Sequence, residues 1–263
     1  MSYWMLLLYS LIFCSMGFYR YIYFFSVGYG LSVAALGVVL AIYHRTTLSV
    51  GELIICALLL IYGQRLSGYL LIRELKSKSY RKVLSPELDR SRRMSIGSKL
   101  AIWISCALLY TLEIIPVYFR MENGASPDAM MYVGIAVMLC GLTLEACADL
   151  QKSAAKKRAP YAPVRTGLFS FVRCPNYLGE MTFWLGMLLS GVNALRGPVQ
   201  WALALLGYAL IVYVMFSGAR RLEIRQNKNY SNDPDYQTYV KRTPILLPFV
   251  PLYSVEKYKW LVA

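Results

Sequence analysis

Three polar side chains stand within stretches of the chain that are otherwise almost entirely apolar. Tyr62 and Arg65 lie three residues apart in the stretch 48–72, and Glu113 lies in the stretch 98–119. A phenol near a guanidinium can donate a hydrogen bond to an oxygen that gains negative charge during a reaction, and a carboxyl group is an alternative donor. Because polar side chains at membrane depth are costly, these residues are candidates for function.

Each of them also has a purely structural explanation. Arg65 can reach the lipid headgroups with its long side chain, and Tyr62 can be an interfacial aromatic residue. Glu113 can pair with Arg65 or satisfy a backbone group freed by Pro116. Counted at 1.5 Å per residue, Glu113 lies ~22 Å and Tyr62 ~15 Å from the basic ends of their helices, so the two can meet in one cavity.

A second group of charged residues follows at helical spacing. Glu145, Asp149 and Lys152 are separated by four and three residues, which places them on one face at the end of an apolar stretch. An ion-pair ladder within the helix is the structural alternative, and it is worth only a few tenths of a kcal/mol. Two carboxylates at a membrane edge indicate a further use, such as accepting hydrogen bonds from a ribose or an adenine amine.

The segment 166–180 reads TGLFSFVRCPNYLGE and combines a turn with a helix start. Gly167 allows a tight turn, Pro175 suits the first turn of a helix, and Asn176 and Glu180 then lie one turn apart. A helix N-terminus offers N–H groups and a positive dipole end to an anion. Five arginines can gather around it: Arg165, Arg173, Arg220, Arg221 and Arg242. They favour a ligand that carries phosphate, and a merely positive surface is the alternative.

The composition excludes several classes of protein. Of 263 residues, 57% are hydrophobic and 16% are charged, which excludes a disordered chain and argues against an ordinary soluble domain. The six cysteines show no metal-ligand spacing, and no P-loop, G-x-G-x-x-G or nucleophile elbow is present, so we expect no metal and no Rossmann domain. The net charge of +14 is concentrated between apolar runs, so membrane orientation explains it and nucleic acid is not an expected partner.

The apolar stretches predict an all-α fold, a polytopic membrane bundle of seven transmembrane helices with a cytosol-facing cofactor pocket. A span needs about 20 apolar residues. The predicted spans are 3–19, 22–43, 48–72, 98–119, 128–149, 177–194 and 197–217, within one integral membrane domain over 1–263. With the N-terminus outside, the inner segments hold 24 Lys and Arg and the outer loops three. The positive-inside rule then makes the tail 218–263 cytosolic, in a bacterial cytoplasmic membrane or the endoplasmic reticulum.

Four sequence elements, in order along the chain, resemble the steroid 5-alpha-reductase C-terminal domain family. The string GLFSFVRCPNYLGE at 167–180 is similar to that family's signature. EACADLQK at 145–152 is similar to its E-x-x-A-D-x-Q-K element, and YQTYVKRTP at 236–244 is similar to its tail. The run YGQRLSGYL at 62–70 also fits.

The resemblance implies a seven-span reductase that binds NADPH and reduces a carbon–carbon double bond conjugated to a ketone. It implies that Tyr62 polarises the carbonyl and that Asn176 and Glu180 contact the nicotinamide end of the cofactor. It also implies that Asp149 contacts the adenosine end. The other predicted cofactor-binding residues are Arg65, Glu145, Lys152, Tyr161, Arg165, Arg173, Tyr177, Arg221, Tyr239 and Arg242.

Two features depart from the family pattern. Cys174 stands where many relatives have the histidine of R-H-P-N-Y. Steroid reductases pair the tyrosine with an upstream glutamate, whereas no acidic residue precedes Glu52 in this chain. Glu113 is therefore the predicted second catalytic residue.

Two other functions remain open from the sequence. Isoprenylcysteine and phospholipid methyltransferases resemble the same superfamily, but they carry R-H-P-x-Y-x-G followed by a pair of glutamates in the tail, whereas the stretch RLEI at 221–224 offers one glutamate, Glu223. Their cofactor, S-adenosylmethionine, carries no phosphate that would explain the arginines. A lipid- or sterol-binding scaffold is the non-enzymatic alternative. In the reductase interpretation, we expect a monomer that acts on a lipophilic small molecule among membrane lipids.

Overall fold

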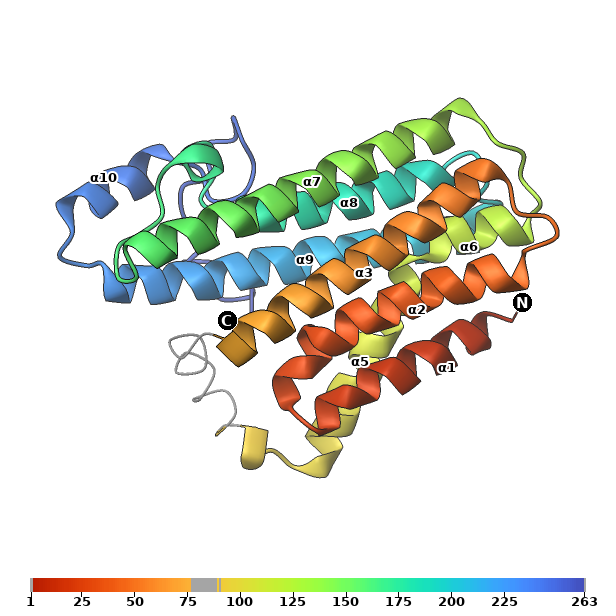
Figure 1. The fold of residues 1–263 in the computed structure, drawn as a ribbon, viewed down its shortest axis with the longest axis horizontal. Coiled ribbons are helices and arrows are strands. Elements are labelled where there is room, and N and C mark those ends of the chain that lie inside the picture. Colours follow the sequence, from red (N-terminus) through yellow and green to blue (C-terminus); the bar gives the residue numbers. More distant parts are fainter. Residues whose placement is uncertain (1, 77–88, 90, 263) are drawn as a thin grey trace. The chain divides into compact units, whose positions relative to one another are not determined.

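The computed structural model describes residues 2–76, 89 and 91–262, and these residues form helices and connecting segments without a β-strand (Figure 1). The all-α class predicted from the sequence is confirmed for this part of the chain. Much of the predicted inner loop between the third and fourth spans lies outside the described residues. The described α-helices are α1 (Tyr3–Cys14), α2 (Val27–Tyr43), α3 (Val50–Lys76), α5 (Ile96–Glu113), α6 (Ile115–Glu122), α7 (Ala129–Arg158), α8 (Pro175–Gly191), α9 (Gly197–Asn229) and α10 (Pro234–Arg242), and the 3-10 helices are η1 (Ser15–Phe18), η2 (Tyr21–Phe25) and η3 (Gly167–Ser170).

Among the described residues, four helices are long and apolar enough to cross a membrane, namely α3, α5, α7 and α9. The helices α1, α2 and α8 have 12, 17 and 17 residues. At about 1.5 Å per residue they are about 18–26 Å long, which is less than the ~30 Å of a hydrocarbon core. The chain therefore has the helices of a membrane protein, and the number of seven spans stays a prediction.

The chain divides into two compact units. Unit 1 comprises residues 1–135 and 187–207, and unit 2 comprises residues 136–186 and 208–263. Each boundary falls inside a helix, so α7, α8 and α9 contribute a segment to both units. The expectation of a single integral membrane domain stays a prediction.

In unit 1, glycines allow α2 and α3 to pack backbone against backbone. A β-carbon on Gly63 would clash with the carbonyl oxygen of Gly30, and one on Gly30 would clash with that of Gly63. The Ser67 hydroxyl donates a 2.9 Å hydrogen bond to the carbonyl of Val27 across the same contact. Close approach of this kind is a common way for helices to associate in lipid. It fixes the rotation of α3, the helix that carries Tyr62.

The predicted fourth span, 98–119, is two helices rather than one. The helix α5 ends at Glu113, Ile114 is a turn residue, and α6 starts at Ile115 with Pro116 in its first turn. Proline has no N–H to bond the carbonyl four residues earlier, and its ring clashes with that carbonyl. That carbonyl belongs to Leu112, and the α9 glycine Gly207 lies so close to it that a β-carbon would clash.

Arg120 is one of the three basic residues that the predicted topology places in outer loops. In the structure it is buried in α6. Its guanidinium forms an ion pair with Asp128 and donates hydrogen bonds to the carbonyls of Ser190, at 2.9 Å, and Ser126, at 3.1 Å. These contacts satisfy the charge from within the protein. Arg120 therefore ties the connection between α6 and α7 to the end of α8, and it is not a solvated loop residue.

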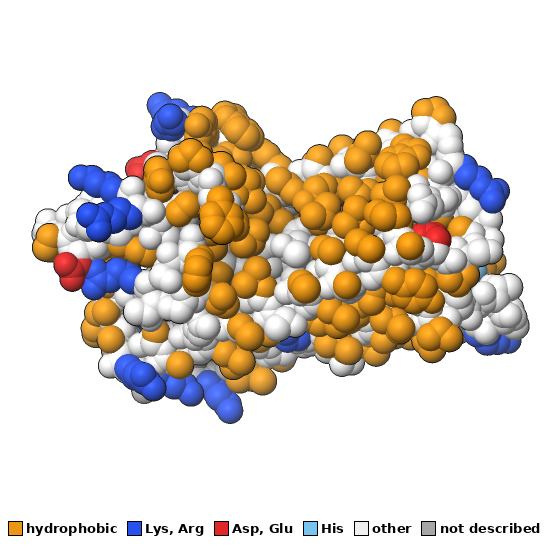
Figure 2. All heavy atoms as spheres, turned by 90° about the horizontal axis from the view of Figure 1, so that it is seen from above, with side chains coloured by type: hydrophobic (Ala, Val, Ile, Leu, Met, Phe, Trp, Pro, Cys, Tyr) orange, Lys and Arg blue, Asp and Glu red, His pale blue; other side chains and the backbone are white. Residues whose placement is uncertain are grey.

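In unit 2, the segments of α7, α8 and α9 run alongside one another, and the C-terminal tail packs against the helix ends (Figure 1). The tail residues Ile245, Leu246, Val255 and Leu261 are buried in a cluster with helix residues that include Leu222. With 30 and 33 residues, α7 and α9 are about 45 and 50 Å long and exceed a bilayer core. Figure 2 shows Lys and Arg side chains near α10, beside a surface rich in hydrophobic side chains.

Candidate functional site

The acidic face predicted on α7 is present in unit 2. Glu145 and Asp149 are buried, with 4% and 9% of their surfaces exposed, and Lys152 is half-buried one turn further on. All three belong to one continuous helix, so their spacing places them on a common face. Because buried carboxylates are costly, their position in a packed helix interface favours a specific use over a solvated surface.

Two glycines bring this face against the start of α8. A β-carbon on Gly179 would clash with the backbone nitrogen of Glu145, and one on Gly141 would clash with the backbone nitrogen of Phe183. The two helices therefore touch through their backbones. This contact places Glu145 beside the first turns of α8, where the predicted nicotinamide residues are found.

Asn176, Tyr177 and Glu180 lie in the first two turns of α8. The helix begins at Pro175, as the sequence predicts. Asn176 and Tyr177 are half-buried, whereas Glu180 is buried and accepts a 3.1 Å hydrogen bond from the indole N–H of Trp184. Asn176 is thus partly accessible in the first turn of α8. Glu180 is held in place by Trp184, which lies one turn further along the helix.

Gln151 joins two of the sequence elements. Its side-chain oxygen accepts a 2.9 Å hydrogen bond from the backbone N–H of Leu168, in η3. Gly167 precedes this contact with φ +65°, and a β-carbon there would clash with the Gln151 amide. Only glycine adopts this backbone conformation at no steric cost. Sequence reasoning assigned Gln151 no role, because its partner lies 17 residues further along the chain.

Gly167→Ala is expected to lower the free energy of unfolding by about 1–2 kcal/mol through the left-handed backbone. A further loss of about 0.5–1.5 kcal/mol is expected, because the new methyl group displaces Gln151 from Leu168. Gly197→Ala is the matched control, since Gly197 has φ +66° and open space around it. Chemical denaturation of both variants in detergent measures the difference. Equal losses would show that the Gln151 contact contributes nothing.

A buried ion pair joins the segment before α8 to α9. The guanidinium of Arg173 lies 2.7 Å from a carboxylate oxygen of Glu223, and their side chains are 1% and 2% exposed. Arg173 also donates to the carbonyl of Tyr253 at 2.5 Å, and Glu223 accepts a 2.8 Å hydrogen bond from the backbone N–H of Val255. Arg173 therefore holds the tail in place.

The five arginines expected around the start of α8 differ in their contacts. Besides Arg173, Arg220 donates to tail carbonyls, those of Glu256 at 2.9 Å and Leu261 at 3.0 Å. Arg165 lies 3.4 Å from Asp235 at the surface. Arg221 and Arg242 are exposed and form no ion pair within the described part of the chain. Three of the five arginines thus bind carboxylates or backbone carbonyls of the protein itself. A charge count does not show these contacts.

The remaining predicted contacts of unit 2 differ in burial. Tyr161 is 91% exposed in the turn after α7. Tyr239, on α10, donates a 2.6 Å hydrogen bond to the carbonyl of Phe169, and burial raises the pKa of its hydroxyl. Burial likewise raises the pKa of Cys174 to about 11. The Cys174 thiol therefore stays protonated at neutral pH.

In unit 1, Tyr62 belongs to a network of tyrosines. Its side chain is fully buried, and its hydroxyl donates a 3.1 Å hydrogen bond to the hydroxyl of Tyr29. The ring of Tyr29 stacks on Tyr110 at 4.4 Å between centroids, and Tyr110 donates to the carbonyl of Phe24 at 2.6 Å. Three helices and η2 thus orient the Tyr62 hydroxyl. Tyr29 and Tyr110 were missed by sequence reasoning, because no local spacing relates them to Tyr62.

Arg65 and Glu113 occupy different environments. Arg65 is half-buried one turn after Tyr62 on α3, in keeping with the predicted spacing. Glu113 is buried, 4% exposed, as the last residue of α5. Tyr110 lies one turn before it on the same helix, so Glu113 adjoins the tyrosine network along α5.

The fold and these buried polar groups define an all-helical membrane protein with ionisable side chains inside its helix packing. The chain belongs to the family described as "Protein of unknown function (DUF1295)", whose model matches residues 18–243. No curated protein and no solved structure matches the chain.

Proposed function

We propose that this protein is a multi-pass membrane reductase that uses NADPH to reduce a carbon–carbon double bond conjugated to a ketone in a lipophilic substrate. The observation that carries the proposal is the connection of three sequence elements in unit 2. Gln151 accepts from Leu168, and the backbone N–H of Arg173 donates at 2.9 Å to the carbonyl of Pro244. The family is also related to steroid 5-alpha-reductase-like proteins, which supports the same chemistry.

The residues of unit 2 fit a dinucleotide that carries phosphate. The buried carboxylates of Glu145 and Asp149 suit ribose hydroxyls or an adenine amine as hydrogen-bond donors. The exposed guanidinium of Arg221 suits a phosphate. The amide of Asn176 offers both a donor and an acceptor, as recognition of a carboxamide requires. Lys152, Tyr161, Arg165, Tyr177, Tyr239 and Arg242 complete the assigned cofactor residues in this unit, and Arg173 contributes by holding the tail.

NADPH, when bound, supplies the hydride. Addition of hydride to the carbon β to a ketone leaves negative charge on the carbonyl oxygen, and a preorganised donor at that oxygen lowers the barrier. We assign this donor role to Tyr62, with Arg65 one turn away on the same helix and Glu113 as the second catalytic group. In the proposed topology the N-terminus lies outside and the C-terminus in the cytosol, so the cofactor pocket is open to cytosolic NADPH. We propose that the protein acts as a monomer.

The experiment that tests the function compares three ligands by thermal shift of the detergent-purified protein. NADPH is expected to raise the melting temperature, because a ligand that binds only the folded state adds about 2.7 kcal/mol at a hundred times its Kd. NADH is expected to shift it less, because it lacks the phosphate that gains charge-assisted hydrogen bonds. A shift with S-adenosylmethionine alone would overturn the proposal in favour of a methyltransferase.

The Asn176→Ala variant is expected to fold, to insert and to lose turnover of an enone with NADPH. The exposed Asn232, in the turn after α9, provides the matched variant Asn232→Ala, which is expected to keep the wild-type rate. Stopped-flow oxidation of NADPH in detergent measures both. Wild-type turnover by Asn176→Ala would remove Asn176 from the site.

A further inference from the structure

The tail presents an aromatic side chain that the described residues leave almost fully exposed. Phe249 is 97% exposed and has φ +65°, a left-handed conformation that is rare for a bulky residue. It stands between Pro248 and Val250 in a loop whose base is closed by a 2.9 Å hydrogen bond from the N–H of Ile245 to the carbonyl of Leu252. The fold therefore holds the ring outward at a conformational cost, without gaining contacts for it.

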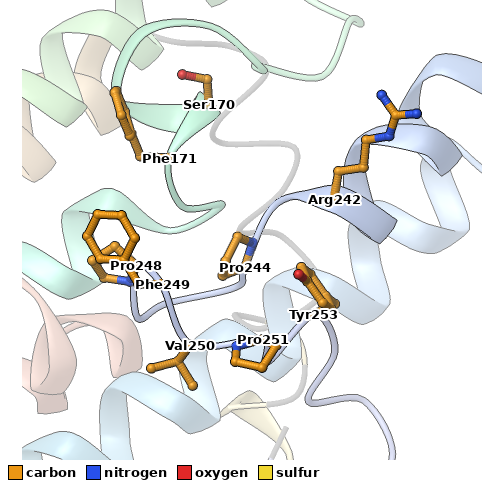
Figure 3. Close-up of a pocket in the computed structure, with 9 residues that line it drawn as sticks. All are labelled: Ser170, Phe171, Arg242, Pro244, Pro248, Phe249, Val250, Pro251 and Tyr253. Atoms are coloured by element: carbon orange, nitrogen blue, oxygen red, sulfur yellow. The ribbon is translucent and has the colours of Figure 1, made fainter.

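A second exposed phenylalanine lies near this loop. Phe171, which follows η3, is 67% exposed. Together with Pro244 and the loop 248–251 it lines a hollow of about 300 Å³, with Arg242 at its rim (Figure 3). The guanidinium of Arg242 extends away from the prolines in Figure 3. Two segments far apart in the sequence thus expose aromatic rings around one hollow beside an arginine.

The depth of the loop follows from the residues beneath it. The backbone N–H of Cys174, directly before α8, donates at 3.0 Å to the carbonyl of Ile245. Ile245 also belongs to the buried cluster that contains Ala219 and Leu222 of α9. These two residues lie about 33–38 Å along α9 from its start at Gly197, compared with ~30 Å for a hydrocarbon core. With the start of α9 placed at the outer edge of the core, as the predicted span 197–217 has it, the loop lies at the boundary between lipid tails and headgroups, at the basic end of α9.

The backbone of the loop is also suited to lipid. Pro248 and Pro251 have no N–H to desolvate. The N–H of Leu252 donates to the carbonyl of Val250 at 2.7 Å, and that of Val250 to the carbonyl of Leu247 at 3.4 Å. Backbone groups that are satisfied internally or absent lower the cost of entering an apolar medium.

We propose that the loop 248–251 and Phe171 form an interfacial anchor, in which the two phenylalanine rings insert among the lipids of the protein's own membrane and Arg242 faces anionic headgroup phosphates. The argument for this occupant is the combination of depth, exposed aromatic rings and a cation at the rim, because apolar side chains such as phenylalanine bury at the boundary between headgroups and acyl chains, and cations are attracted to anionic headgroups. Neither phenylalanine is among the residues assigned to the cofactor, and Arg242 is the one residue that the anchor shares with the proposed cofactor site. The effect of the anchor is to fix the tail, and with it the Arg173 contact, against the bilayer.

Fluorescence depth measurements test the anchor in the full-length protein. Phe249→Cys is made in a Cys140→Ala, Cys147→Ala background, because the other four cysteines are buried, and is labelled with the environment-sensitive probe NBD. The protein is reconstituted in phosphatidylcholine–phosphatidylglycerol vesicles that contain nitroxide-labelled lipid. Asn232→Cys, labelled in the same background, is the matched control at an exposed turn beyond the helix ends.

The label at position 249 is expected to show blue-shifted emission and several-fold stronger nitroxide quenching than the label at 232, which iodide in the water is expected to quench instead. Phe171→Cys is expected to behave as position 249 does, and it serves as the second test should the first variant not fold. Iodide quenching at 249 and 171 equal to that at 232 would overturn the proposal and indicate that the rings await a protein partner or a ligand.

Discussion

Arg173→Met is expected to lower the free energy of unfolding by about 3–5 kcal/mol, because it leaves the carboxylate of Glu223 buried and without its cation. The pair is 2.7 Å apart and almost fully buried. The substitution also removes the hydrogen bond to the Tyr253 carbonyl, so the tail loses an attachment. Chemical denaturation in detergent, with limited proteolysis of the tail as a second readout, measures the effect.

Two further variants separate a buried charge from a general loss of an arginine. Arg165→Met breaks the surface pair with Asp235, whose side chain is 77% exposed, and is expected to cost less than about 1 kcal/mol. The double variant Arg173→Met, Glu223→Met is expected to recover part of the loss, since two apolar side chains can replace a buried pair. Recovery stays incomplete because Val255 loses the acceptor of its N–H. A single-variant loss as small as that of Arg165→Met would contradict a stabilising role for the pair.

Tyr62→Phe is expected to reduce enone turnover by on the order of a hundredfold or more, because it deletes the proposed hydrogen-bond donor to the developing oxyanion. The ring and its packing are retained. Since the hydroxyl donates to Tyr29, a loss of about 0.5–1.5 kcal/mol in the free energy of unfolding is also expected. Affinity for NADPH, measured by calorimetry, is expected to stay close to that of the wild type.

Tyr29→Phe is the control that distinguishes catalysis from packing. It removes the other hydroxyl of the same hydrogen bond, so its cost in stability is expected to match that of Tyr62→Phe. Turnover is expected to fall far less, because the Tyr62 hydroxyl remains. If Tyr62→Phe reduces the enone at the wild-type rate, Tyr62 has only a packing role and Glu113 is the next donor to test.

The positions of the helices were largely predictable from the sequence, but the break between α5 and α6 was not. The apolar stretch 128–149 and the Pro175 start signal correspond to α7 and α8, because length, apolar composition and proline act locally. The stretch 98–119 was wrongly predicted as one helix, although Pro116 marks the break. The sequence shows that a proline disfavours the helix there, but it does not show whether the helix bends or ends.

In the candidate site, too, local features were predictable and long-range contacts were not. The shared face of Glu145, Asp149 and Lys152 was predictable, because helical periodicity alone places residues four and three apart on one side. The contacts of the arginines were not predictable, because a charge count does not show that Arg220 donates to backbone carbonyls or that Arg173 pairs with a distant carboxylate.

The sequence by itself determined that this is an all-helical chain with several helices long and apolar enough to cross a membrane, and it determined which helix face carries the acids. These properties depend on residues within a few turns of one another. Only the tertiary structure decided that Arg173 pairs with Glu223, 50 residues away, and that Tyr62 bonds to Tyr29, 33 residues away. Such partners are selected by which surfaces can be buried together with their polar groups satisfied, and that is a property of the packed chain.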